Sequence, residues 1–390
     1  MKILVLTGSY FPYGAAMSSR VSNFCRLFYA AGYSVHVIAP FSKESIMINH
    51  VENLEYCTYQ ITSSLKPSSR TSFFGVDGYC EEISSYLNSN RCDLIFVAGV
   101  EPYYNRIIRL SKQKQIPVIA EQCEWMDKSS YTFGLIDYRK IRRDYLLMKG
   151  YKRTSAIIAI SRLLYNHYKS IGIRSIRIPT ILDVNNIEWT DRNENDRKRI
   201  IYTGNPGKSK EFLKPIIYVF KNNKHIQKAF EFHIFGPDKS TVASNTGIKV
   251  EDLRMLSNCV YIHGMVSQLM IYGEIRASDY QIFLRPERRS SDAGFPTKMG
   301  ESFSVGTPII TNMTGDIELY MRDGVEGYYV NDVTEDDVLR VFERIMDASE
   351  EECRNMRICS RNKAEVAFNY LSYVDDVKQL LEECIQNEPL

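Results

Sequence analysis

The first forty residues constrain the fold most, because they combine two short apolar runs with an amphipathic segment between them. Residues 2–8 read KILVLTG and residues 34–40 read SVHVIAP, and both runs are almost continuously apolar. The intervening SSRVSNFCRLFYAAG repeats apolar side chains at helical spacing and ends on Gly32. This order predicts a strand, a helix and a second, parallel strand.

Similar apolar runs recur along the chain. The first half continues with DLIFVAGV, IPVIAEQCE and AIIAIS, and the second half contains RIIYTG, FEFHIFG, CVYIHG, YQIFLRP, TPIITN and EGYYV. Runs of this kind suit strands that are buried on both faces, and the helical patterns between them favour parallel pairing. We therefore expect an α/β protein with two Rossmann-like, doubly wound parallel-sheet domains.

A polar stretch separates the two series of strands. Residues 180–198 are rich in Asn and Asp, which is typical of a linker, and a chain of 390 residues exceeds the usual size of one hydrophobic core. We expect an N-terminal domain over residues 1–183 and a C-terminal domain over residues 184–371, facing each other across a cleft. A last helix, residues 372–390, should pack back on the first domain.

Composition argues against several classes of protein. The formal net charge is +2, which is too small for a protein that wraps nucleic acid. The nine cysteines are scattered and never spaced CxxC, so they predict reduced thiols and neither a zinc site nor a disulfide framework. The opening apolar run is too short for a signal-peptide core or a membrane span. We expect a cytoplasmic protein that binds no nucleic acid.

The stretch GFPTKMGES, residues 294–302, has the residue types that hold a nucleotide at a helix start. Pro296 suits the first helical position, and the N–H groups at Thr297 and its neighbours would point at an anion together with the positive end of the helix dipole. Lys298 adds a full charge, and Glu301 on the same face could accept hydrogen bonds from ribose hydroxyls. The alternative is an ordinary surface ion pair between Lys298 and Glu301.

Two further features supply cations after strands. The stretch YTGNPGKSKE, residues 202–211, places a tight glycine turn before Lys208 and Lys210, which suits a diphosphate. Arg285 closes the run YQIFLRP and is a third candidate partner for an anion, with a structural salt bridge as its alternative. No G-x-G-x-x-G follows the first strand and no P-loop motif occurs, which argues against those nucleotide sites.

These windows, in this order, resemble the GT-B glycosyltransferases of the retaining GT4-like group, and most of all the enzymes that build bacterial capsule, exopolysaccharide or lipopolysaccharide. The most specific match is GFPTKMGESFSVGTPIITN followed by DGVEGYYV, and FPYGAAMSSR, AIIAISRLLYNHY, RIPTILD and FHIFG also match. The resemblance implies a hexosyltransferase that moves a sugar from a UDP-, GDP- or ADP-sugar to an acceptor hydroxyl with retention of configuration. The nucleotide sugar is a substrate, so we expect no separate cofactor, and the absence of a DxD pair predicts that no metal is required.

The resemblance also assigns donor-binding roles to individual residues. It implies that Lys298 and the adjacent backbone clamp the diphosphate, that Glu301 binds the ribose, and that Lys210 and Gly14 approach the phosphates. The expected donor-binding set is Gly14, Asn205, Lys210, Arg285, Phe295, Thr297, Lys298 and Glu301.

This chain departs from the family pattern on the sugar side. Asn205 stands where relatives have the arginine of a basic pair, and Ala293, with Asp292 beside it, stands where many have a first glutamate. A histidine that many relatives carry after the run PVIAEQCE is also absent. Our candidates for catalytic roles are Glu121 and Glu124, for acceptor orientation or general-base help, together with Asp292. Purely structural carboxylates are the alternative.

The acceptor is expected on the first domain. The segment RKIRRDYLLMKGYKR, residues 139–153, carries seven Lys or Arg with Leu and Tyr interleaved. This pattern predicts either a solvated basic helix or contact with the anionic cytoplasmic face of the inner membrane, where a lipid-linked saccharide acceptor would lie. Three other functions remain open: a GT-B-fold nucleotide-sugar epimerase or hydrolase, an inactive nucleotide-sugar-binding relative, and a two-domain sugar-binding protein.

Overall fold

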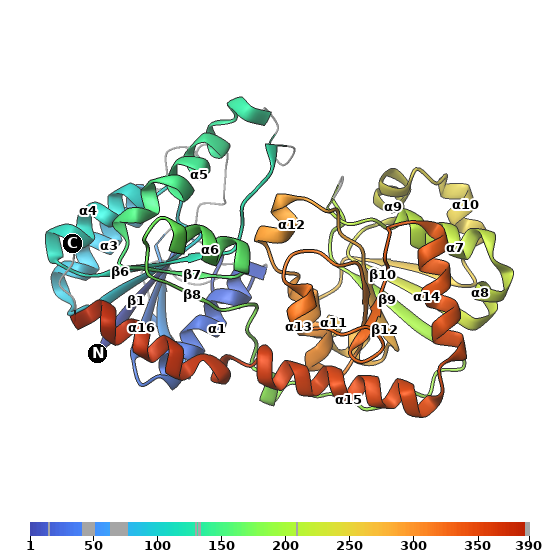
Figure 1. The fold of residues 1–390 in the computed structure, drawn as a ribbon. Coiled ribbons are helices and arrows are strands. Elements are labelled where there is room, and N and C mark those ends of the chain that lie inside the picture. Colours follow the sequence, from blue (N-terminus) through green and yellow to red (C-terminus); the bar gives the residue numbers. More distant parts are fainter. Residues whose placement is uncertain are drawn as a thin grey trace. The chain divides into compact units, whose positions relative to one another are not determined.

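The computed structural model describes residues 1–14, 16–40, 51–62, 77–128, 131, 134–207 and 210–386. The chain forms two compact units (Figure 1). Unit 1 comprises Met1–Leu182 and Tyr370–Leu390, and unit 2 comprises Asp183–Asn369. Among the residues that the structure describes, no helix has the length and apolar character needed to cross a bilayer.

Unit 1 is built on an eight-stranded sheet with the strand order β3-β4-β2-β1-β5-β6-β7-β8, which is parallel except for the β3–β4 pair. Five strands lie at predicted runs: β1 (Lys2–Thr7), β2 (Ser34–Ala39), β5 (Leu94–Ala98), β6 (Val118–Gln122) and β7 (Ala156–Ala159). Three strands were not predicted: β3 (Val51–Leu54), β4 (Cys57–Ile61) and β8 (Ser175–Arg177).

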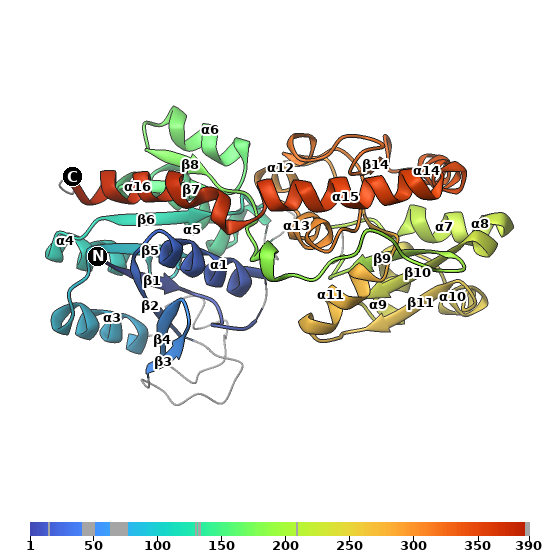
Figure 2. The same ribbon diagram turned by 90° about the horizontal axis from the view of Figure 1, so that it is seen from below.

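Helices cover both faces of this sheet (Figure 1). They are α1 (Ala16–Ala30), α3 (Asp77–Ser89), α4 (Tyr104–Lys114), η2 (Gly134–Ile136), α5 (Tyr138–Met148), η3 (Gly150–Arg153), α6 (Arg162–Ser170), η6 (Tyr370–Tyr373) and α16 (Val374–Gln386). The helix α1 packs Phe24 and Phe28 against Phe96 of β5, with ring centroids 5.0 Å apart in both pairs. The last helix, α16, buries Val377 and Leu381 in the same core, on the same face of the sheet as α1 (Figure 2).

Unit 2 is built on a wholly parallel six-stranded sheet with the order β11-β10-β9-β12-β13-β14. All six strands lie at predicted runs: β9 (Lys198–Thr203), β10 (Phe230–Phe235), β11 (Val260–Gly264), β12 (Tyr280–Phe283), β13 (Ile309–Thr311) and β14 (Gly327–Tyr329). The helices are η4 (Val184–Asn186), α7 (Lys214–Asn222), α8 (Lys224–Ala229), α9 (Lys239–Thr246), α10 (Val250–Met255), α11 (Gln268–Arg276), α12 (Arg289–Ala293), α13 (Thr297–Ser304), η5 (Ile317–Leu319), α14 (Glu335–Asp347) and α15 (Glu350–Ala367). The α/β class with two Rossmann-like sheets is therefore confirmed.

The Asn- and Asp-rich stretch that the sequence suggests as a linker lies on unit 2. Arg357 of α15 donates from Nε to the carbonyl of Thr190 at 3.1 Å, and Arg361 donates from Nη1 to the carbonyl of Ile187 at 3.1 Å. Both arginines are buried, so backbone carbonyls that would otherwise need water are satisfied by fixed cations. The stretch is held in place although it contains few apolar residues.

The chain passes between the units at two neighbouring points. Within unit 2, the Asn369 side chain donates from Nδ2 to Oδ1 of Asn185 at 2.9 Å. Within unit 1, the backbone N–H of Tyr370 donates to the carbonyl of Leu182 at 3.0 Å. The first and last residues of unit 2 therefore lie close together.

Candidate active site

The start of helix α13 has no side-chain cap. Pro296 stands at the N-cap with φ −73° and ψ 103°, one position before the first helical residue that the sequence predicted it to be. No side chain caps the helix at this residue. The first N–H groups, from Thr297 onward, thus point out of the helix end without a side-chain acceptor at the N-cap. The ring of Phe295 is packed 5.3 Å from that of Tyr320 and 5.7 Å from that of Phe368, so it belongs to the core.

Lys298 lies in a buried charge cluster. Its ammonium forms an ion pair with the carboxylate of Glu211 and lies 4.5 Å from the ring centroid of Tyr202, whose hydroxyl also donates to Glu211. Burial lowers the pKa of Lys298, although Glu211 opposes this effect. Burial alone would raise the pKa of Glu211, but Lys298 and the Tyr202 hydroxyl outweigh it and hold that pKa below its ordinary value. The Glu211 carboxylate is therefore held in its charged form by these two neighbours.

Glu301 and Arg285 differ from this pair because neither forms an ion pair with another described residue. The Glu301 carboxylate makes no hydrogen bond or ion pair within the described part of the chain, and burial raises its pKa against the effect of Lys298. Arg285 is buried, and its guanidinium makes one hydrogen bond there, from Nη1 to Thr314 Oγ1 at 3.5 Å. Burial lowers the pKa of Arg285, and the charges of Glu211 and Asp292 oppose this effect. The structural salt bridge considered for Arg285 does not occur among the described residues.

The glycine loop after β9 adjoins Lys298. Gly204 has a φ of +116°, which favours glycine, and a Cβ there would lie 3.0 Å from Cε of Lys298. Asn205 is exposed and its Oδ1 accepts the N–H of Gly207 at 2.9 Å, so this side chain holds the turn. Lys210 is exposed and makes no side-chain ion pair among the described residues, whereas Lys208 lies outside them.

A pocket of about 560 Å³ opens beside this loop. It is lined by Gly207 of the loop and by polar, uncharged side chains of α9: Ser240, Thr241, Ser244 and Asn245. Asn245 donates from Nδ2 to the carbonyl of Gly207 at 2.9 Å and so joins the helix to the loop. The lining offers hydroxyl and amide groups, which suit a polar, neutral part of a ligand.

Two other expected site residues have local structural contacts. Asp292 in α12 accepts the N–H of Gly315 at Oδ1, at 2.9 Å, and Ala293 is fully buried. Asp292 therefore supports the loop after β13. Gly14 belongs to unit 1, in the loop before α1, where a Cβ would collide with the side chains of Ser18 and Tyr10.

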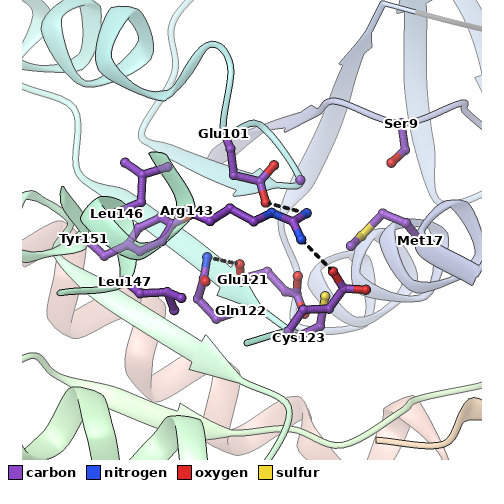
Figure 3. Close-up of a pocket in the computed structure, with 12 residues that line it drawn as sticks. Ser9, Met17, Glu101, Glu121, Gln122, Cys123, Arg143, Leu146, Leu147 and Tyr151 are labelled. Carbon is purple, nitrogen blue, oxygen red and sulfur yellow. Dashed lines mark hydrogen bonds and ion pairs between the residues drawn. The ribbon is translucent and has the colours of Figure 1, made fainter. Parts of the chain in front are cut away.

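Unit 1 contains its own pocket, of about 250 Å³, at the carboxyl ends of β1, β5 and β6 (Figure 3). Three carboxylates line it, from Glu101, Glu121 and Glu124, together with one guanidinium, from Arg143. Other lining residues are Ser9, Met17, Gly99, Gln122, Cys123, Leu146, Leu147 and Tyr151. The sequence predicted Glu121 and Glu124 as neighbours, and the structure adds Glu101 and Arg143 from distant segments.

Glu121 is fixed by a buried arginine. Arg20 of α1 donates from Nε to Glu121 Oε1 at 2.7 Å and from its two other nitrogens to the carbonyls of Pro179, at 2.7 Å, and Ile178, at 3.1 Å. The other carboxylate oxygen, Oε2, is buried and has no hydrogen-bond partner among the described residues. Burial raises the pKa of Glu121, and Arg20 opposes this effect. A buried acceptor without a donor needs a partner, and a ligand hydroxyl in the pocket would supply one.

Arg143 joins the two other carboxylates of the pocket. It lies 3.2 Å from Glu101 Oε1 and 3.1 Å from Glu124 Oε2 (Figure 3). The Glu124 side chain is half exposed, so this pairing is open to solvent on one side. The sequence treated Arg143 only as a member of a basic helix. The sequence analysis also assigned no role to Arg20 or Glu211. These are the last residues of the segments FPYGAAMSSR and YTGNPGKSKE.

Comparisons with known proteins agree with this architecture. Residues 197–347 match the sequence model of a family described as Glycosyl transferases group 1. No curated protein sequence matches the chain significantly. Sucrose-phosphate synthase from Thermosynechococcus elongatus has a similar structure, with a TM-score of 0.74, 13% sequence identity, and coverage of 98% of this chain and 99% of that one.

Two further solved structures are similar over the same extent. HepE of Anabaena, in complex with UDP and glucose, has a TM-score of 0.70 and 12% identity, with 98% of this chain and 99% of that one covered. The lipopolysaccharide outer core galactosyltransferase WaaB has a TM-score of 0.63 and 12% identity, with the same coverage. Together with the two parallel sheets, these likenesses show that this chain has the fold of the GT-B glycosyltransferases.

Proposed function

We propose that this protein is a glycosyltransferase that moves a sugar from a nucleotide-diphosphate sugar to an acceptor hydroxyl, with retention of configuration and without a metal ion. The observation that carries this proposal is the buried guanidinium of Arg285, which has no acidic partner among the described residues. The charge of Glu211 acts on both Arg285 and Lys298, which places the two cations in one electrostatic environment. A diphosphate is the anion that two cations and an open helix start would hold.

The same groups suit the departure of a nucleoside diphosphate. Negative charge grows on the phosphate as the sugar bond breaks, and cations with helix-start N–H groups stabilise such charge without rearranging. For a retaining transfer, the acceptor hydroxyl attacks the sugar carbon on the same face from which the nucleoside diphosphate leaves. The leaving phosphate oxygen takes the proton of that hydroxyl. The Glu301 carboxylate, which has no hydrogen-bond partner in the described part of the chain, accepts the ribose hydroxyls, and the polar pocket beside Gly207 receives the nucleoside.

The pocket of unit 1 is the proposed acceptor site. Glu121 presents a buried oxygen to which no described residue donates, and Glu124 is half exposed next to Arg143. Carboxylates in such positions orient hydroxyl groups by accepting their hydrogen bonds. Among the similar proteins, HepE was solved in complex with UDP and glucose, and WaaB is a lipopolysaccharide outer core galactosyltransferase. By analogy, we propose a saccharide acceptor from surface-polysaccharide synthesis, free or carried on a lipid.

The nucleotide site can be tested by thermal unfolding with UDP, GDP or ADP in the presence of EDTA. A ligand at about one hundred times its Kd stabilises the folded state by about 2.7 kcal/mol, so one nucleotide should raise the unfolding temperature. Arg285→Gln and Glu301→Gln should each weaken the shift. Lys228→Ala, an exposed cation on α8, is the matched control. If none of the three nucleotides changes the unfolding temperature of the wild-type protein, the proposed nucleotide site is refuted.

The reaction can be tested with the corresponding nucleotide sugar, with and without saccharide acceptors. Transfer should depend on an acceptor, proceed in EDTA and give a product whose anomeric proton keeps the donor configuration by NMR. Release of free sugar in the absence of an acceptor would identify a hydrolase, and an epimerised donor would identify an epimerase. Nucleotide binding without any of these reactions would identify an inactive relative.

A further inference from the structure

One short segment of unit 1 concentrates exposed apolar side chains. Five of the ten large apolar side chains that the described part of unit 1 exposes lie between residues 135 and 148. They are Leu135, Ile136, Ile141, Tyr145 and Met148, and the most exposed are Ile136 at 80%, Leu135 at 66% and Ile141 at 57%. Single exposed apolar residues are ordinary, but five within one short segment form a patch. We call these five residues the apolar stripe.

The apolar stripe follows one side of α5. Ile141, Tyr145 and Met148 are spaced i, i+4, i+7, so they lie on one helix face, whereas Leu146 and Leu147 are buried in unit 1. Leu135 and Ile136 of η2 extend the stripe beyond the start of α5. In Figure 1, α5 leads away from the sheet of unit 1, and η2 lies at its far end. The stripe is therefore carried on a projecting part of the unit.

Cations lie at the other end of α5. Lys149, Lys152 and Arg153 follow the helix directly and are exposed. Arg153 donates to Asn105 Oδ1 and to the carbonyl of Gly150, and none of the three makes an ion pair among the described residues. Their charge is thus available to an anionic partner.

The acidic side chains of this segment are already neutralised. Asp137 caps α5 and accepts hydrogen bonds from Arg139 at 2.9 and 2.7 Å, and Asp144 forms an ion pair with Lys140 one turn away. The segment consequently presents apolar side chains and unpaired positive charge, with little opposing negative charge.

We propose that the apolar stripe and the cations that follow it form a docking surface for an anionic lipid bilayer. The apolar side chains enter the boundary between headgroups and acyl chains, and Lys149, Lys152 and Arg153 contact the lipid phosphates. A second copy of the chain is a poorer occupant, because a symmetric interface on this patch brings the same cations together. The inference stands apart from the proposed transfer reaction, since it uses neither the nucleotide site nor the pocket of unit 1.

Vesicle flotation of the full chain tests this surface. The protein should float with vesicles of phosphatidylcholine mixed with phosphatidylglycerol, less with phosphatidylcholine alone, and less at high salt. The double variant Leu135→Ser, Ile136→Ser should partition at least about tenfold more weakly, because two apolar side chains no longer enter the bilayer. Met255→Ser, a residue of unit 2 that is 81% exposed, is the matched control and should bind like wild type.

Two results would overturn the proposal: wild-type protein that does not float with the anionic vesicles at low salt, or a double variant that floats as well as wild type. A concentration-dependent dimer in solution that the double variant loses would assign the stripe to a second copy instead. An unchanged unfolding temperature shows that the variant is folded. If UDP raises the unfolding temperature of the double variant as much as that of the wild type, the nucleotide site is intact and the flotation result concerns the apolar stripe alone.

Discussion

His36 in β2 makes the stability of unit 1 depend on pH. Its Nδ1 lies 2.7 Å from Thr58 Oγ1, its Nε2 lies 3.2 Å from Gln60 Oε1, and its ring is stacked on Tyr86 with centroids 4.5 Å apart. Gln60 donates from Nε2 to Glu82, which leaves Oε1 to accept the His36 N–H. The neutral ring therefore satisfies both neighbours, and burial away from water opposes the addition of a second, charged proton.

The size of the effect follows from the pKa of this ring. Burial lowers the pKa of His36 from 6.5 to about 4, with a further contribution from the charge of Lys2. Between these two values the unfolded chain binds more protons than the folded one, so the free energy of unfolding rises with pH. The stabilisation from neutral His36 is complete above the pKa that His36 has in the unfolded chain. It is lost as the pH falls toward the pKa that His36 has in the folded protein. Lowering the pH from about 7.5 to about 5 removes about 2 kcal/mol.

Urea unfolding at the two pH values measures this loss. The chain has two tryptophans, Trp125 in unit 1 and Trp189 in unit 2, so after Trp189→Phe the tryptophan fluorescence, excited selectively, reports on unit 1 alone. In this background, His36→Gln should remove about 2 kcal/mol of the pH dependence, because the side chain no longer titrates. The exposed His225 is the control, and its change to Gln should alter nothing. Equal pH dependence with and without His36 would refute the reasoning.

Other buried contacts give further predictions. Lys298→Met leaves the buried Glu211 carboxylate without its ion-pair partner and should destabilise unit 2 by about 3–5 kcal/mol near neutral pH, and by less in acid, where Glu211 is protonated. Adding Glu211→Gln should recover most of this loss in urea unfolding, and no recovery would contradict the pairing. Arg20→Met should raise the pKa of Glu121 further and shift the rising limb of the transferase pH profile to higher pH, and Arg20→Lys should shift this limb less. If the limb does not shift in Arg20→Met, Glu121 is not the group that titrates there. Phe368→Ala empties a fully buried aromatic site in unit 2 and should cost about 3–5 kcal/mol in urea unfolding in a Trp125→Phe background, where Trp189 reports on unit 2; a loss below about 1 kcal/mol would show that the cluster closes around the gap.

The strands that the sequence predicted share one physical property. Those of unit 2 and five of unit 1 belong mainly to sheet interiors, where continuous apolar runs are required. The three missed strands lie toward the two edges of the sheet in unit 1, and β3 and β8 are only partly buried. An edge strand needs fewer apolar side chains, so its sequence resembles that of a loop.

The candidate site was predictable where local sequence determines geometry. The start of α13 near Pro296 follows from helix chemistry, and the structure differs by one position. The partners of side chains depend on contacts between distant segments, and no local pattern showed that Lys298 pairs with Glu211. In the same way, the sequence around Asp292 does not show that its carboxylate accepts the N–H of the distant Gly315.

The neighbouring crossings at Leu182 and Tyr370 have a practical consequence for this protein. Because Asn185 and Asn369 are joined by a hydrogen bond, a gene fragment encoding residues 183–369 specifies one uninterrupted domain with adjacent ends. The complementary piece needs only a brief spacer to reconnect its own two ends, since Tyr370 is bonded to Leu182. The proposed nucleotide and acceptor binding can thus be assayed on two separately expressed polypeptides, and chimaeras that exchange unit 2 need junctions only at these two neighbouring points.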